Sequence, residues 1–172
     1  ILVQAQQQPT QILTVVPFVD INRYVGNWYE IARLPNRFQK QCIGDVTATY
    51  ILQSDGTIKV INRCQNANGE FEEAEGQAKK NRDDKSNAKL KVRFAPKILS
   101  FLPFVWGNYW VIDLAADYTY AVIGEPDRKY LWILSRTPTI DEDKLQIILE
   151  GIKAKGYDLS TLSRTKQTKS SE

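Results

Sequence analysis

The side chains that most enzymes and metal sites rely on are scarce in this sequence. Its 172 residues include no histidine and two cysteines. Without histidine the chain has no imidazole base, no Ser-His-Asp triad and no histidine metal ligand, and two cysteines alone cannot complete a zinc site. Glycine-rich phosphate-binding motifs are missing as well. We therefore expect a protein without catalysis, bound metal or cofactor.

Glu30 is the acidic residue with the most informative position. It shares the alternation of Trp28 and Ala32, so its carboxylate is expected to face the inside of a half-buried strand. A buried carboxylate needs a partner. Two interpretations stay open. The one we favour is a structural hydrogen bond; in the other, Glu30 contacts a ligand or acts as an unusual acid.

Aromatic residues carry a second kind of chemistry, that of an apolar pocket. Four of them fall on different predicted strands, and several of these have an alternation compatible with facing inward: Tyr50, Tyr109, Tyr120 and Trp132. Asn62 lies on the same face as Tyr50 if residues 53 and 57 pair across a hairpin. Aromatic walls with a few hydroxyl and amide groups are typical of small-molecule sites. The alternative is plain core packing in a filled barrel.

The two cysteines indicate an exported protein. Cys42 and Cys64 bracket a predicted hairpin whose turn is at 54–56, so both lie near the end of the hairpin away from that turn. One disulfide between them is the expectation for a protein outside the reducing cytosol. Two buried free thiols, or one reactive thiol, are the alternatives.

The hydrophobic pattern predicts an all-β protein. Short segments of alternating apolar and polar residues are separated by turn residues, and they give eight strands, at 28–34, 45–53, 57–65, 71–80, 89–94, 109–114, 120–124 and 130–135. Eight strands at this spacing favour a closed antiparallel up-and-down barrel over a sandwich. The loop at 36–44 is longer than a hairpin needs, which makes it a candidate lid.

One amphipathic helix follows the strands. Thr139 and Glu142 form a capping-box pattern at its start, and Gly156 is expected to end it. Its apolar stripe consists of Leu145, Ile148, Leu149 and Ile152. At helical spacing this stripe predicts packing against the outer wall of the barrel.

Three residues favour a barrel that is closed at one end. Gly26 leaves room for Trp28 to be buried where the chain enters the barrel. Arg136, at the end of the last long strand, can lie across the indole face. The other end of the barrel then stays open, and an open cup with an apolar interior can carry a small hydrophobic molecule.

The chain is expected to form one domain at residues 18–165. Residues 1–17 are interpreted as the remnant of a secretory signal peptide followed by a linker, and residues 166–172 as a disordered tail. This organisation predicts an exported protein, periplasmic or extracellular. The net charge is +3 with both signs mixed along the chain, so no nucleic-acid-binding face is expected.

An apolar, proline-punctuated loop occupies residues 96–107. It suits neither a central strand nor a solvated loop, and an exposed apolar loop usually marks contact with a membrane, a partner or a ligand. The alternative is a lid folded over the barrel mouth. The residues assigned to membrane contact are Ile98, Leu99, Phe101, Leu102, Phe104 and Trp106.

Three segments resemble the signature regions of the lipocalin family. They are GNWYEIA at 26–32, ADYTYA at 116–121 and YLWILSRTP at 130–138. They occur in the order of the family, with the helix after the third. They are most similar to the branch that holds the bacterial lipocalin, apolipoprotein D and the plant temperature-induced lipocalins.

The resemblance implies a barrel that binds a fatty acid, a lysophospholipid or another small apolar ligand without catalysis, as a monomer or weak homodimer. Trp132, Tyr50 and Asn62 match pocket positions of apolipoprotein-D-like members, and Tyr109 matches less closely. The loop at 98–106 is similar to one that plant members use for membrane association. The alternatives are one of the few lipocalin enzymes, acting on a lipid or a carotenoid, and an interaction module with a filled barrel.

Overall fold

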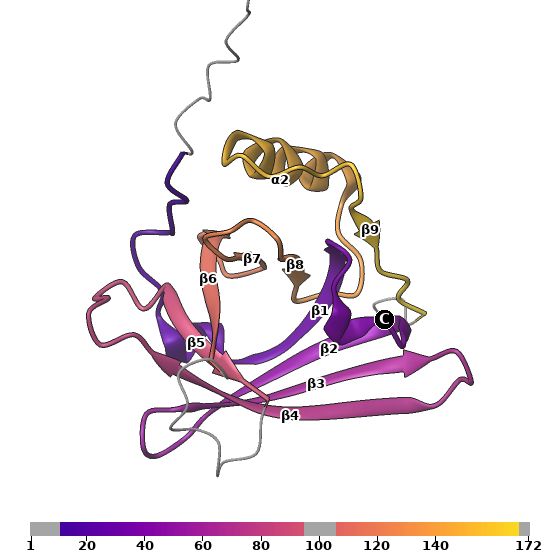
Figure 1. The fold of residues 1–172 in the computed structure, drawn as a ribbon, viewed down its shortest axis with the longest axis horizontal. Helices are drawn as coiled ribbons and strands as arrows, with labels where there is room; N and C mark the ends of the chain where they lie inside the picture. Colours follow the sequence, from indigo (N-terminus) through magenta and orange to yellow (C-terminus); the bar gives the residue numbers. More distant parts are fainter. Residues whose placement is uncertain (1–10, 95–105, 169–172) are drawn as a thin grey trace, which may run out of the picture.

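The computed structural model describes residues 11–94 and 106–168, and its strands form one antiparallel barrel (Figure 1). The strands are β1 (Gly26–Arg33), β2 (Cys42–Leu52), β3 (Ile58–Asn66), β4 (Phe71–Lys80), β5 (Lys89–Arg93), β6 (Gly107–Leu114), β7 (Tyr120–Gly124), β8 (Leu131–Ser135) and β9 (Ser163–Arg164). Neighbours follow the order β2-β3-β4-β5-β6-β7-β8-β1-β9, and β1 also pairs with β2, which closes the sheet. The predicted eight-stranded barrel is confirmed, whereas the short β9 was not predicted.

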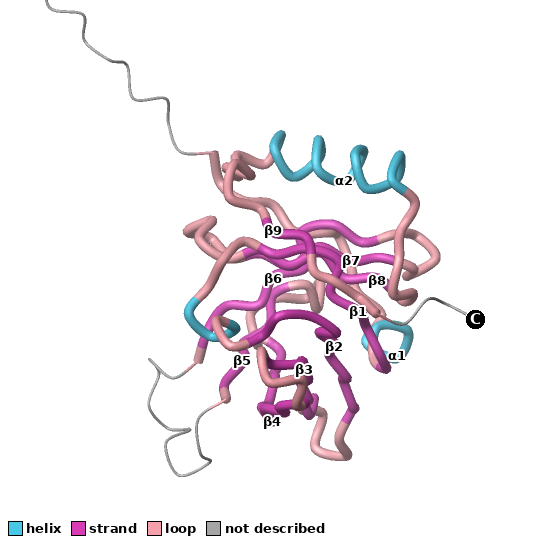
Figure 2. Tube along the Cα trace, turned by 90° about the vertical axis from the view of Figure 1, so that its right-hand side faces the viewer, coloured by secondary structure: helices cyan, strands magenta, loops and turns pink. Residues whose placement is uncertain are grey.

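Helical segments lie at both ends of the chain and in one loop. They are α1 (Ile21–Tyr24), the 3-10 helix η1 (Arg37–Gln39) and α2 (Glu142–Ala154). The predicted helix α2 packs on the outside of the barrel (Figure 2). Within the described ranges, no helix has the length and apolar character needed to cross a bilayer.

The start of α2 differs from the expected capping box. Asp141 is the N-cap, and its carboxylate accepts from the Lys144 amide at 3.1 Å. The Thr139 carbonyl accepts from the Thr137 hydroxyl at 2.7 Å, so Thr139 belongs to the turn before the helix. The capping-box prediction was wrong because an Asp closer to the helix takes the capping position.

Two apolar clusters result from the alternation of side chains along the strands. On β7, Ala121 and Ile123 face the barrel interior, whereas Val122 faces outward. The outward cluster also contains the buried face of α2, formed by Leu145, Ile148 and Ile152. The helix therefore covers the outward-facing apolar residues of the barrel wall, as its apolar stripe predicts.

Residues beyond the expected domain bounds also contact the barrel. Leu13 is buried beneath α2, and the Val16 amide donates to the Val111 carbonyl at 3.0 Å. At the other end, the Asp45 amide donates to the Lys166 carbonyl at 2.8 Å. The packed structure extends past residues 18 and 165 on both sides.

One end of the barrel is closed by Trp28 and Arg136. The indole is fully buried, and the Arg136 guanidinium lies 3.8 Å from its ring centre. The same guanidinium donates to the carbonyls of Asn27 at 2.9 Å and Tyr24 at 3.0 Å, which ties the approach to β1 to the end of β8. Gly26 has a φ of 105°, and a side chain there would come within 3.3 Å of Arg136.

We expect Trp28→Ala to lower the free energy of unfolding by about 3–5 kcal/mol, because a large buried ring and its contact with Arg136 are both lost. Trp28→Phe keeps most of the apolar volume and is the control, with a smaller loss. Denaturant unfolding followed by circular dichroism measures both. An unchanged midpoint for Trp28→Ala would show that this contact does not hold the barrel closed.

Candidate functional site

The barrel interior changes from packed to accessible along its axis. Near the closed end, the inward side chains of β3, β4 and β5 are at most 3 % exposed: Ile58, Val60, Ala78 and Leu90. Farther along these strands, Asn62 and Val92 are only partly buried, and Ala74, opposite Asn62 in the register, is exposed. These inward-facing side chains are therefore not fully covered in the open half of the barrel.

Three tyrosines form a hydrogen-bonded chain across the interior. The hydroxyls of Tyr24 and Tyr109 are 2.6 Å apart, and the Tyr109 hydroxyl donates to that of Tyr50 at 2.9 Å. Because each hydroxyl carries one proton, Tyr24 donates to Tyr109, and the proton of Tyr50 has no acceptor among the described residues. The chain ends in a spare donor on the interior face of β2.

Burial extends the pH range over which these phenols are neutral. It raises the pKa of Tyr50 to about 12. It also raises the pKa values of Tyr24 and Tyr109 well above their ordinary value. The Tyr50 hydroxyl therefore keeps its proton, and stays a hydrogen-bond donor, up to a higher pH than an exposed tyrosine would.

Asn62 lies on the same interior face as Tyr50. The Gln53 amide donates to the Thr57 carbonyl at 2.8 Å, which is the hairpin pairing on which this prediction depended. In the resulting register Tyr50 is opposite Val60, and Asn62 is one inward position farther toward the mouth. The Asn62 amide has no hydrogen-bonding partner within the described parts of the chain. Tyr50 and Asn62 thus present unused polar groups within an apolar wall.

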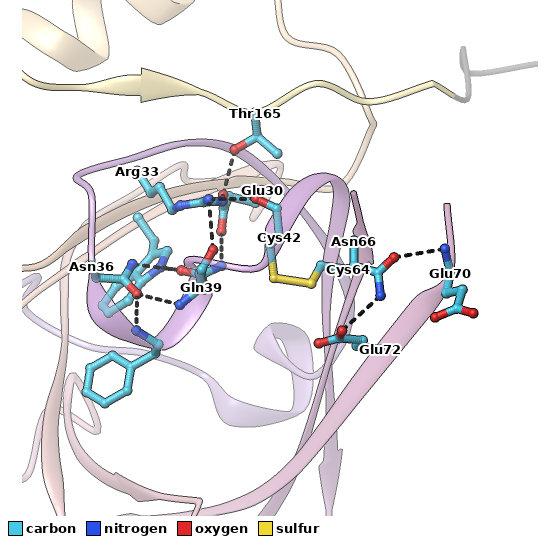
Figure 3. The surroundings of a disulfide bond; sticks show 12 residues. Glu30, Arg33, Asn36, Gln39, Cys42, Cys64, Asn66, Glu70, Glu72 and Thr165 are labelled. Atoms are coloured by element: carbon cyan, nitrogen blue, oxygen red, sulfur yellow. Dashed lines mark hydrogen bonds and ion pairs between the residues drawn. A yellow bond between two sulfur atoms is a disulfide. The ribbon is translucent and has the colours of Figure 1, made fainter. Parts of the chain in front are cut away.

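A polar network joins several elements at the open end (Figure 3). The Trp132 indole N–H donates to Gln39 Oε1 at 2.8 Å, and Gln39 Nε2 donates to Glu30 Oε2 at 2.8 Å. Glu30 Oε1 also accepts from Arg33 and from the Thr165 hydroxyl, both at 2.6 Å. Glu30 is 2 % exposed, and its carboxylate is occupied by these protein donors. The structural hydrogen bond that we favoured for Glu30 is present.

Arg33 and Gln39 were missed by the sequence reasoning. The register between β1 and β8 shifts between Glu30 and Ala32, which inserts Ile31 as an extra residue in β1. This bulge moves Ala32 to the outer cluster and places Arg33 beside Glu30. Simple alternation predicts instead that Ala32 faces inward with Glu30 and that Arg33 faces outward. For Gln39, the only sequence signal is its place in the loop that we expected to be a lid.

Tyr120 does not belong to the interior. Its neighbour Ala121 faces inward, so Tyr120 lies in the outer cluster beside α2, and its hydroxyl donates to Asp113 Oδ2 at 3.2 Å. The expectation that Tyr120 lines the pocket was therefore wrong. By contrast, Tyr50, Tyr109 and Trp132 all contribute to the interior cluster.

The predicted disulfide between Cys42 and Cys64 is confirmed (Figure 3). It joins the first residue of β2, directly after the η1 loop, to β3, with the two Cα atoms 5.5 Å apart. Both cysteines are thus bonded, and no free thiol exists among the described residues. The same part of the chain has no group of three or more acidic, histidine or cysteine side chains placed to hold a metal ion.

Trp106 is the one residue assigned to membrane contact that the structure describes. Its ring lies 3.9 Å from Lys79 Nζ and 5.2 Å from the Arg93 guanidinium, on the outer side of the sheet. The other five assigned residues, Ile98, Leu99, Phe101, Leu102 and Phe104, lie outside the described residues.

The buried phenols predict a loss of stability at alkaline pH. The pKa of Tyr50 is near 10 in the unfolded chain and about 12 in the folded protein, so the unfolded state releases its proton first. The contribution of Tyr50 to the free energy of unfolding is fully present below pH 10. It is lost as the pH rises toward 12, by about 1.4 kcal/mol for each unit between the two pKa values. Tyrosinate absorbance and unfolding midpoints between pH 8 and 12 measure this effect. Ionisation of every tyrosine near pH 10 without unfolding would contradict it.

Comparison with known proteins gives a consistent assignment. Residues 19–167 match the family model described as a lipocalin-like domain. The chain is 44 % identical to temperature-induced lipocalin-1 of Arabidopsis thaliana, over 91 % of this chain and 83 % of that protein. It is 44 % identical to the outer membrane lipoprotein Blc of Citrobacter freundii, over 92 % and 85 %. Mouse apolipoprotein D is 30 % identical over 86 % and 77 %.

Solved structures share the barrel at lower sequence identity. Insecticyanin from the tobacco hornworm Manduca sexta superposes with a TM-score of 0.68 at 24 % identity, over 94 % of this chain and 89 % of that chain. At this identity the likeness concerns the fold alone. The signature segments, the closed barrel and the sequence relatives agree, and the chain belongs to the lipocalin family.

Proposed function

We propose that this protein binds and carries or stores a small ligand with a long apolar body and one oxygen-bearing polar group, a fatty acid or a lysophospholipid. The observation that carries the proposal is the Tyr50 hydroxyl, a buried donor without an acceptor among the described residues, on the interior face. The Tyr50 oxygen accepts from Tyr109 while its own proton is unused, so an acceptor atom on a ligand would add a hydrogen bond to the site. The neighbouring Asn62 amide offers both a donor and an acceptor.

Apolar burial would supply most of the affinity. Each methylene removed from water contributes about 0.8 kcal/mol, against several kcal/mol of lost translational and rotational freedom on binding. Val92, Tyr109 and Trp132 are partly buried residues packed against the interior cluster, and they would line the path of a hydrocarbon chain. Binding would need neither a metal nor an ion pair.

We propose a non-catalytic role. Both cysteines are in the disulfide, so the thiol chemistry considered as an alternative would require its reduction. Glu30, the acid that the sequence singled out, is buried and already accepts from Arg33, Gln39 and Thr165. A general acid or base must be free to exchange a proton with the substrate, and Glu30 faces its own protein partners instead.

Export and peripheral membrane contact are further parts of the proposal. The disulfide is typical of proteins outside the reducing cytosol. Relatives named outer membrane lipoprotein support an envelope location. Trp106, with Lys79 beside its ring, has the aromatic and cationic character that suits a headgroup region.

Titration of delipidated protein with the fluorescent fatty acid cis-parinaric acid tests the proposal. We expect saturable binding at micromolar concentration or tighter, displaced by oleic acid or lysophosphatidylcholine more effectively than by retinol or a sterol. If retinol alone displaced the probe, the ligand class would be a retinoid and not a fatty acid or lysophospholipid. The absence of saturable binding would contradict the carrier function and favour a filled barrel.

The Tyr50 donor has its own test with a matched control. Tyr50→Phe removes the spare hydroxyl, and we expect fatty-acid affinity to fall about fivefold, as for one lost hydrogen bond. Diphenylhexatriene, a hydrocarbon probe without oxygen, should bind both proteins equally. Tyr120→Phe deletes a hydroxyl on the outer face and should leave both affinities unchanged. Equal affinity of Tyr50→Phe for the fatty acid would remove Tyr50 from the site.

A further inference from the structure

Gln39 uses its whole side-chain amide to hold one loop against the barrel mouth. Its Oε1 accepts from Trp132 Nε1 and from Asn36 Nδ2, both at 2.8 Å. Its Nε2 donates to Glu30 Oε2 at 2.8 Å. One amide on the β1–β2 loop thus contacts β8 on one side and β1 on the other.

Among the described residues, the middle of this loop has one other hydrogen bond to the barrel, a longer one of 3.4 Å from the Arg33 guanidinium to the Gln39 carbonyl. None of the η1 residues is buried, and Phe38 is 58 % exposed although its ring centre lies 5.6 Å from that of Tyr130. The turn itself is local, because Asn36 Oδ1 accepts from the amides of Phe38 and Gln39. An intact turn could therefore move as a unit once the hydrogen bonds of the Gln39 side chain and the longer one from Arg33 are broken.

The points on either side of the loop are fixed. The Leu34 amide donates to the Leu131 carbonyl at 3.0 Å, and Cys42 is joined to Cys64. The acceptor Glu30 is held by Arg33 and by Thr165, whatever Gln39 does. The loop is thus fixed at both ends, and among the described residues the shortest hydrogen bonds from the segment between these ends to the barrel are those of the Gln39 side chain, at 2.8 Å against 3.4 Å for the bond from Arg33 to the Gln39 carbonyl.

We infer that Gln39 is a latch that sets how fast ligands enter and leave the barrel. The inference rests on the proposed ligand-binding function. With Gln39 in place, the Trp132 N–H faces protein and η1 is held against β8. When Gln39 is released, η1 swings about residues 34 and 42, and the Trp132 N–H becomes available to the interior. Gln39 acts by positioning the loop and does not contact the ligand.

This mechanism has a kinetic signature. If the loop must open before a ligand passes in either direction, a change in the open population multiplies the association and dissociation rates by the same factor and leaves Kd unchanged. Gln39→Leu removes the hydrogen bonds to Trp132 and to the charged Glu30, so we expect both rates to rise about tenfold or more. A residue that contacts the ligand would instead change mainly the dissociation rate.

Stopped-flow measurements with cis-parinaric acid distinguish these cases. The control is Gln41→Leu, the same substitution on an exposed residue of the same loop that has no side-chain partner among the described residues. We expect parallel acceleration of both rates in Gln39→Leu and wild-type rates in Gln41→Leu. Faster dissociation alone, equal rates in Gln39→Leu and wild type, or the same acceleration in both variants would overturn the latch.

A second measurement needs no ligand. The Trp132 indole N–H should be protected from hydrogen exchange in the wild type and in Gln41→Leu, and should exchange faster in Gln39→Leu. Two-dimensional NMR resolves indole protons, and Trp132→Phe assigns the signal. Unprotected exchange in the wild type would overturn the latch even if fatty acids bind. Protection that depends on Gln39, in a protein that binds no probe, would support the attachment of the loop while contradicting the carrier function.

Discussion

Strand β1 must be paired along both edges for the barrel to close, and much of the remaining structure follows from how this is achieved. Residues 26–29 pair with β2 on one edge, and residues 29–33 pair with β8 on the other. Along 29–33 the edge toward β2 would otherwise expose backbone groups that need partners. β9 and the residues after it take this place, and Gln167 Nε2 donates to the carbonyls of both Glu30 and Val46 at 2.9 Å.

Strand β1 therefore contributes both to the closed, packed end of the barrel and to the polar network at its open end. Where β1 pairs directly with β2, it buries Trp28 beneath Arg136. Where the C-terminal segment lies along it, β1 carries the bulge at Ile31, and Arg33 turns toward Glu30. The carboxylate then collects donors from β1, from the η1 loop and from Thr165. Polar groups accumulate at this end because the regular ladder between β1 and β2 stops there.

Features set by local pattern were predictable from the sequence, and features set by distant partners were not. Strands, helix and disulfide follow from alternation, helical spacing and the place of two cysteines on one hairpin. Tyr120 was assigned to the wrong face because β7 is buried on both sides, so its apolar run carries no alternation. The orientation of Arg33 depends on a bulge that has no mark in the sequence. The role of Gln39 depends on Trp132, 93 residues away. Three of the four aromatic residues predicted for the interior, Tyr50, Tyr109 and Trp132, do lie there, but the groups that hold the mouth could not be predicted.

The charges at the mouth bear on how a ligand of the proposed kind would be selected. Glu30 and Arg33 are 2.6 Å apart, with side chains 3 % and 15 % exposed, so their fields largely cancel at longer distances. An anionic ligand would then be held by neutral donors and not by net charge. Hydrogen bonds from Tyr50 and Asn62 would contribute about 1 kcal/mol each, whereas ten buried methylenes would contribute roughly 8 kcal/mol. Hydrocarbon length would therefore determine affinity, and the two polar residues would determine which end of the ligand lies deepest in the barrel.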